Sequence, residues 1–155
     1  MARALTGAEA SALRPFFPAQ TLTMVRFAAV PMIENPPFYT ALEEAGIGIP
    51  LDFRGMTGIT FVDTVLISQV APMPEGEWLP LLFHELVHVL QYQELGLERF
   101  VRVYVTGWAA AGGSYPDIPL ERDAYELDGQ FRAEPTRPFD ALGAVRQRLA
   151  AHAAA

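Results

Sequence analysis

The sequence predicts an α+β fold in which a small, twisted antiparallel sheet packs on one long apolar helix and on further helices. Three observations lead to this prediction. β-forming residues gather in the first half of the chain, a mostly apolar helical run of about 16 residues follows them, and helix signals recur from there to the end. With 155 residues and 51% hydrophobic composition, the chain has the size of a single domain over residues 1–155.

The N-terminal segment carries a helix signal. Thr6 to Glu9 has the spacing of a capping box, in which two side chains satisfy the free backbone donors of a first turn. A short helix is therefore expected to begin near Gly7 and to stop before Pro15, which lacks a backbone donor. Phe16 and Phe17 are then expected to enter the core.

The next segments alternate between β and helix signals. Thr21–Val30 is rich in β-forming residues and alternates loosely, so it predicts a first strand that ends at Pro31. A short helix is expected over Phe38–Ala45, while residues 47–58 hold too many glycines and prolines for regular structure and predict a loop.

A β-hairpin is predicted in the middle of the chain. Its arms are Ile59–Val62 and Val65–Val70, and Asp63-Thr64 forms the turn between them. The loop that follows, residues 72–78, leads into the apolar run.

The second half of the chain predicts helices. Gly96 stands where a left-handed cap ends the first of them, and Gly112-Gly113 ends the second. The predicted helices are Leu79–Leu95, Leu97–Ala111, a third from Pro119 to about Ala133, and a terminal helix with a frayed tail over Asp140–Ala155.

Composition excludes several functional classes. The chain has no cysteine, which rules out disulfides, thiolate metal sites, cysteine nucleophiles and the deformylase type of HExxH site that needs a cysteine ligand. Its formal charge of −7 comes from scattered residues and leaves no basic patch for nucleic acid. No apolar run reaches the ~20 residues of a bilayer span, and no signal peptide is evident, so a soluble, cytoplasmic protein without a membrane partner is expected.

The stretch HELVHVLQ places three polar side chains, whose burial is energetically unfavourable, inside the most apolar predicted helix. His84 and His88 are four residues apart, so on a helix they share one face and can reach one metal ion. Glu85 lies about 100° round the helix, where it can act as a base on a metal-bound water. Because burying unpaired charge costs several kcal/mol, a divalent ion is a better explanation for the triplet than a set of ordinary core histidines.

A catalytic zinc ion normally has three protein ligands and one water, so a third ligand is needed. It is not a histidine at the end of a longer HExxHxxGxxH motif, because Glu94 occupies that position. The other histidine of the chain, His152, belongs to the alanine-rich tail and is expected at the surface. The third ligand is therefore expected among the downstream carboxylates.

Glu121 is the best-placed of these carboxylates. It stands in the first turn of a helix that follows a Gly-Gly loop, and the small Ala124 on the same face allows close packing against the HExxH helix. Asp117 and Glu126 are weaker alternatives. A surface role for Glu121, in which its charge interacts with the helix dipole, is the competing interpretation.

With these residues the sequence resembles the gluzincin metallopeptidases, most closely the compact bacterial minigluzincins, over Gly58–Gln130. The resemblance implies a zincin-like fold in which His84, His88 and Glu121 bind Zn²⁺. It also implies that Glu85 activates the water that attacks a peptide carbonyl. A peptide or protein substrate is then expected to lie antiparallel along an edge strand, which corresponds here to Val65–Val70.

Two features of the family pattern are open in this sequence. The larger gluzincins often carry an aspartate four residues after the ligand glutamate to orient a histidine, whereas this chain has Tyr125, which leaves Asp123 or Asp128 as substitutes. The family also uses a tyrosine or histidine to stabilise the oxyanion, and Tyr115 is the candidate here. Tyr92, Tyr125 and Arg122 could approach the cleft as well, while Trp78 and Trp108 are expected to be packing residues.

Three functions are compatible with this pattern. The first is a zinc-dependent peptidase of limited specificity. The second is an HExxH metal-binding regulatory module that acts on one partner protein with little general proteolysis. The third is a structural domain that has lost its chemistry, which the presence of His84, Glu85 and His88 together argues against.

Overall fold

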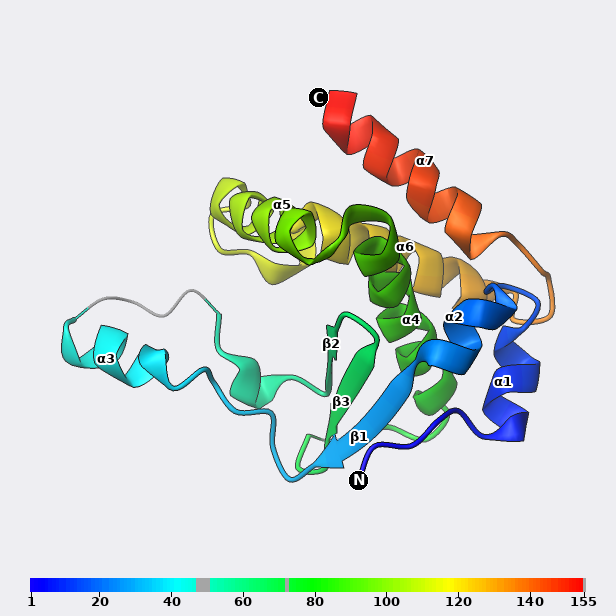
Figure 1. Ribbon diagram of the computed structural model, residues 1–155, viewed down its shortest axis with the longest axis horizontal. Helices are drawn as coiled ribbons and strands as arrows, with labels where there is room; N and C mark the ends of the chain where they lie inside the picture. Colours follow the sequence, from blue (N-terminus) through cyan, green and yellow to red (C-terminus); the bar gives the residue numbers. More distant parts are fainter. Residues whose placement is uncertain (47–50, 72, 155) are drawn as a thin grey trace.

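The computed structural model describes residues 1–46, 51–71 and 73–154, which form an α+β arrangement of seven α-helices and a mixed three-stranded sheet (Figure 1). The residues left out fall within the predicted loops 47–58 and 72–78 and at the end of the predicted terminal helix. In chain order the elements are α1 (Gly7–Leu13), α2 (Ala19–Met24), β1 (Arg26–Val30), α3 (Phe38–Glu44), η1 (Phe53–Gly55), β2 (Gly58–Phe61), β3 (Thr64–Ser68), α4 (Trp78–Leu95), α5 (Leu97–Ala110), η2 (Tyr115–Asp117), α6 (Pro119–Ala133) and α7 (Ala141–Ala154).

Helix α1 begins as the capping box predicts. The Thr6 hydroxyl accepts a hydrogen bond from the Glu9 backbone N–H at 3.2 Å, and the Glu9 carboxylate accepts one from the Thr6 N–H at 2.7 Å. Glu9 also accepts hydrogen bonds from Arg3 and from the Trp78 indole, which anchors the N-terminus to the start of α4. Phe16 and Phe17 are each 3% exposed, so their predicted burial is confirmed.

The predicted strand Thr21–Val30 is wrong in its first half. Residues 19–24 form α2, and only Arg26–Val30 is a strand. Tertiary contacts outweigh the β-propensity of this segment, because α2 buries Leu22 in the core and Thr21 donates a hydrogen bond to Gln93 of α4.

The sheet is mixed, not antiparallel, and its strand order is β1-β3-β2. β2 and β3 form the predicted antiparallel hairpin, but β1 pairs with β3 in parallel, from Arg26 opposite Thr64 to Val30 opposite Ser68. The hairpin is determined locally by its turn, whereas the side on which β1 joins depends on the long connection between β1 and β2.

The hairpin turn is shifted by one residue from the prediction. Phe61 pairs with Thr64, so Val62 and Asp63 form the turn, and Val62 adopts a positive φ of 58°. The expectation that Val65–Val70 is an edge strand is also wrong, because β3 has β1 on one side and β2 on the other. The edge nearer α4 is β2, which has β3 as its one strand partner among the described residues.

Helix α4 is the centre of the molecule (Figure 1). It contacts β2 on one side and α2, α5, α6 and α7 on the others, so every residue from Leu82 to Tyr92 is buried. Phe83 stacks on Phe131 of α6 with ring centroids 4.6 Å apart, and each such buried aromatic or aliphatic side chain contributes about 1.5–3 kcal/mol to stability. This surrounding core is what holds the polar triplet of α4 in place.

Helices α5 and α6 approach each other closely at the first turn of α6. Gly96 has the positive φ expected at the end of α4, at 73°, although its ψ of 163° is extended and not helical. At Gly107, a Cβ atom would lie 2.6 Å from Cδ of Pro119, so the missing side chain lets α5 reach the first turn of α6. This contact fixes the start of the helix that carries Glu121.

The remaining predicted elements are found with small changes in their bounds. The segment 51–57 is mostly irregular, as expected, and contains the short turn η1, and α3 projects to one side of the sheet (Figure 1). The terminal helix begins at Ala141, after Asp140 accepts a hydrogen bond from the Gly143 N–H. None of the helices in the described residues is long and apolar enough to cross a membrane.

Candidate metal centre

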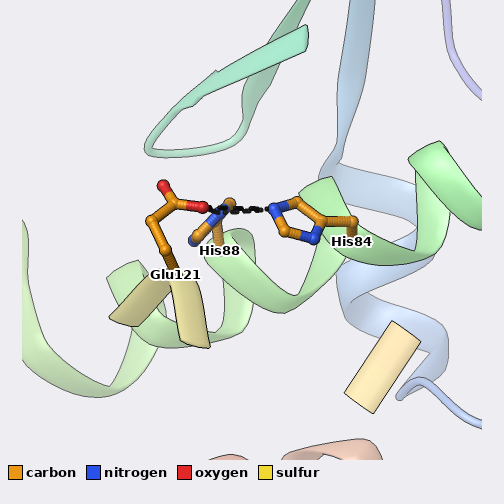
Figure 2. A group of neighbouring side chains, drawn as sticks. All are labelled: His84, His88 and Glu121. Atoms are coloured by element: carbon orange, nitrogen blue, oxygen red, sulfur yellow. Dashed lines mark hydrogen bonds and ion pairs between the residues drawn. The ribbon is translucent and has the colours of Figure 1, made fainter. Parts of the chain in front are cut away.

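The structure brings His84, His88 and Glu121 together in one buried group that could hold a metal ion. The two histidine Nε2 atoms are 3.2 Å apart, and each lies 3.3 Å from Oε2 of Glu121. Figure 2 shows the imidazoles of α4 and the carboxylate of α6 pointing toward one another. Of the carboxylates considered from the sequence as a third ligand, Glu121 is the one that reaches the two histidines.

Local geometry places each of the three groups. His84 and His88 are one turn apart on α4, which aligns them on one face. Glu121 is in the first turn of α6, and Ala124 next to it on that face is completely buried, so the two helices pack closely as the sequence suggested. The competing interpretation, an exposed Glu121 at a helix end, is excluded by its exposure of 2%.

The second nitrogen of each imidazole faces an acceptor. Nδ1 of His84 is 3.1 Å from Oδ2 of Asp128, and Nδ1 of His88 is 2.8 Å from Oε1 of Gln91. Gln91 is itself oriented by a hydrogen bond from its amide to the Leu120 carbonyl. In a neutral imidazole these contacts place the proton on Nδ1 and the lone pair on Nε2.

The donor set fits a metal ion. With both histidines neutral, the lone pairs of two Nε2 atoms and one carboxylate oxygen converge without a hydrogen between them, an arrangement that is repulsive unless a cation or proton lies among them. Ligands bound tetrahedrally at ~2.0–2.1 Å from an ion lie about 3.3 Å from one another. The distances of 3.2 and 3.3 Å in this group match that spacing.

The pKa values of His84, His88 and Glu121 reflect how close these side chains lie to one another. Burial lowers the pKa of His84, but the Asp128 and Glu121 carboxylates outweigh burial and raise it to about 9. The pKa of His88 is likewise raised, against the effect of burial, by the charge of Glu121. Burial works to raise the pKa of Glu121, but the two histidines hold it below its ordinary value. The group therefore favours a negative carboxylate with positive charge beside it.

Glu85 is buried next to this group and is held by β2. Its Oε2 accepts a hydrogen bond of 2.6 Å from the Thr60 hydroxyl, which also donates to the Glu85 carbonyl at 3.2 Å. Gly58 permits the contact, because a Cβ there would lie 2.5 Å from Oε1 of Glu85. Burial raises the pKa of Glu85, which brings its carboxyl group toward the range of a general base.

Tyr104 is a residue that sequence reasoning missed. Its hydroxyl donates a hydrogen bond of 2.7 Å to Oε1 of Glu121, which leaves Oε2 for the two histidines. The only signal in the sequence is a tyrosine on the same helical face as Phe100, which also fits a packing residue. Tyr115, the predicted oxyanion group, lines the same cleft as Glu121 and Tyr104, and burial and the charge of Glu121 raise its pKa, so its hydroxyl stays protonated.

The structure distinguishes between Asp123 and Asp128, the two candidates for orienting a histidine. Asp128 contacts His84 and is held in turn by Arg132 Nε at 2.6 Å, and Arg132 also pairs with Glu77. Asp123 is also buried on α6, but its carboxylate pairs with His152 at 2.7 Å and not with His84 or His88. His152 is thus half-buried and not a free surface residue.

The other residues considered from the sequence lie around or away from the centre. Tyr125 packs against His84 with ring centroids 4.6 Å apart, and Tyr92 stacks on Phe100 in the cleft. Asp117 and Arg122 are exposed, and Glu126 pairs with Arg148 on the surface.

Comparison with known proteins adds no assignment to this geometry: no protein-family profile, curated protein or solved structure matches the chain.

Proposed function

We propose that this protein is a zinc-dependent peptidase. The observation that carries the proposal is the convergence of His84, His88 and Glu121 beside a buried carboxylate, Glu85, at the floor of a cleft. Two imidazoles and one carboxylate at tetrahedral spacing are the ligands of catalytic zinc sites that leave one position for water. A zinc ion bound there would polarise both that water and a substrate carbonyl.

The residues of the chain have separate roles in this reaction. Glu85 takes a proton from water as the water oxygen bonds to the carbonyl carbon, and gives it to the amine nitrogen as the C–N bond breaks. Thr60 keeps the carboxylate of Glu85 in place by its hydrogen bond to Oε2. Tyr115 donates a hydrogen bond to the carbonyl oxygen as its negative charge develops.

The substrate is proposed to lie along β2, the edge strand that borders the cleft. All four residues of β2, Gly58–Phe61, line this cleft, and an exposed edge offers backbone donors and acceptors to an extended peptide. β2 takes the place that the sequence had suggested for Val65–Val70.

Metal analysis and peptide digestion test the proposal together. Protein purified without added zinc is expected to contain close to one equivalent of metal, and His88→Ala is expected to lose it. Glu85→Gln should keep the metal and lose hydrolysis, because the ligands are untouched and the base is gone. Hydrolysis that persists in Glu85→Gln would refute the mechanism. A metal-loaded protein that cuts no peptide in a random library would favour a regulatory metal-binding module instead.

A further inference from the structure

An apolar cleft opens directly from the metal centre, between β2 and α5. We refer to it as the α5 cleft. Its floor is formed by Glu85, His88 and Glu121, and its volume is about 130 Å³. Its walls are apolar on both sides and consist of Phe100, Val101 and Val105 from α5 with Phe53, Ile59 and Phe61 opposite.

The size of the α5 cleft suits one large side chain. An apolar cavity of ~150 Å³ lined by leucine, isoleucine and phenylalanine takes up benzene and stays free of water. A cleft of about 130 Å³ with a similar lining therefore has room for an aromatic ring or a branched aliphatic group. Small side chains would leave it partly empty.

The charge of the lining argues against a charged ligand. Apart from the groups of the metal centre, no ionisable side chain other than those of tyrosines lines the α5 cleft within the described part of the chain. A lysine or glutamate side chain inserted there would lose its hydration without gaining a partner. A second cleft of about 470 Å³ also borders Gly58 and carries charged side chains in its lining, among them Asp52, Asp128 and Arg132. The two clefts share Met56, Gly58, Glu85 and Tyr115, so a peptide that passes Glu85 can meet a cleft without charged walls on one side and a cleft with charged side chains on the other.

The rim of the α5 cleft is exposed in the free protein. Val101 and Val105 on α5 are 47% and 55% exposed, and Phe61 on β2 is 51% exposed. An apolar side chain entering between the two elements would cover part of this surface, at about 25 cal/mol for each Å² removed from water. The rim thus favours occupants of the same apolar class as the walls.

We propose that the α5 cleft is the specificity site of the enzyme and that it takes a bulky apolar side chain, aromatic or branched aliphatic, on a residue beside the scissile bond. This inference rests on the proposed peptidase function. It assigns Val101 and Val105 as specificity-determining residues, and it predicts that the other side of the scissile bond tolerates polar residues.

The test uses ten-residue peptides that differ only at one central position, which is Phe, Leu, Ala, Lys or Glu. Zinc-loaded wild-type protein is expected to cut next to Phe and Leu at least tenfold faster, by kcat/KM, than next to Ala, Lys or Glu. Val101→Asp is expected to lose about tenfold for the Phe peptide and to gain for the Lys peptide. Leu97→Asp is the matched control, because Leu97 is an exposed residue one turn before Val101 on the same helix but outside the cleft.

Binding separates this inference from the proposed function. The Phe and Glu peptides are titrated into Glu85→Gln protein by calorimetry, with and without the additional Val101→Asp change. If the wild type cuts peptides without preference, or if Val101→Asp and Leu97→Asp behave alike, the specificity site is refuted and the peptidase function is retained. If no peptide is cut but Glu85→Gln binds the Phe peptide in a Val101-dependent way, the α5 cleft is retained as a binding site for apolar side chains and the peptidase function is refuted. Absence of both cleavage and Phe-selective binding overturns both.

Discussion

The Tyr104 hydroxyl donates a hydrogen bond of 2.7 Å to Oε1 of Glu121, while Oε2 of the same carboxylate lies 3.3 Å from both histidine Nε2 atoms. The tyrosine thereby divides the carboxylate between Oε1, which accepts its hydrogen bond, and Oε2, which faces the two histidines of the candidate metal centre. Partners of this kind orient ligands and contribute measurably to metal affinity.

Tyr104→Phe is expected to weaken metal binding about tenfold, because a buried carboxylate oxygen loses its hydrogen-bond donor. Competition with a chromogenic chelator measures the change. Tyr92→Phe is the control, since Tyr92 is another buried tyrosine of the same cleft, stacked on Phe100. Equal affinities of the two variants would show that the Tyr104 hydroxyl does not position Glu121.

Asp128→Ala is expected to lower metal affinity by about 10- to 100-fold, because Nδ1 of His84 loses the acceptor that orients the ring. The comparison is Asp123→Ala, which removes an equally buried carboxylate of α6 bound to His152 instead. Both variants are expected to lower the melting temperature, so metal affinity, and not stability, is the discriminating measurement. A loss of affinity in both would indicate a general effect on α6.

Gly58→Ala is expected to reduce kcat by roughly 100-fold without loss of metal, since the new Cβ would displace the Glu85 carboxylate and leave the ligands in place. Peptide hydrolysis and metal content are measured on the same preparation. Gly55→Ala serves as the control, because a Cβ at Gly55 meets no atom within 4 Å. Full activity in Gly58→Ala would mean that the position of Glu85 is not critical.

Metal affinity is expected to rise as the pH rises from about 6.5 to about 9. The pKa of His84 is raised from 6.5 to about 9 by its carboxylate neighbours, so a proton must leave before Nε2 can bind a metal ion. The stability of the metal-free protein is expected to fall over the same pH range. The stability from charged His84 is fully present below about pH 6.5 and is lost as the pH rises through about 9.

Calorimetric titration in buffers of different ionisation enthalpy measures the protons released on metal binding, and denaturant unfolding of chelator-treated protein measures the stability. His84→Gln is the reference, since it removes the titrating group. An affinity that is constant across this range would show that His84 is not protonated in the metal-free protein.

Local sequence signals determined the parts of the fold that depend on neighbours in the chain. The capping box at Thr6–Glu9, the helix α4 and the hairpin of β2 and β3 follow from such signals, and so does the shared face of His84 and His88. The carboxylate of Glu121 was also selected from its place in a first helical turn, and the structure brings it to the two histidines. The helices, their caps, the hairpin and the shared face of the histidines need only local patterns, whereas the meeting of Glu121 with the histidines also needs α6 to pack on α4.

Tertiary structure decided the features that depend on how separate elements meet. It turned residues 19–24 into a helix, placed β1 parallel to β3, and made β2 the strand beside the cleft. It also selected Asp128 over Asp123 as the partner of His84. It brought the Tyr104 hydroxyl to Glu121 and the Thr60 hydroxyl to Glu85. These contacts join residues 17 to 44 positions apart, and no local pattern encodes them, because they exist only once the core around α4 has packed.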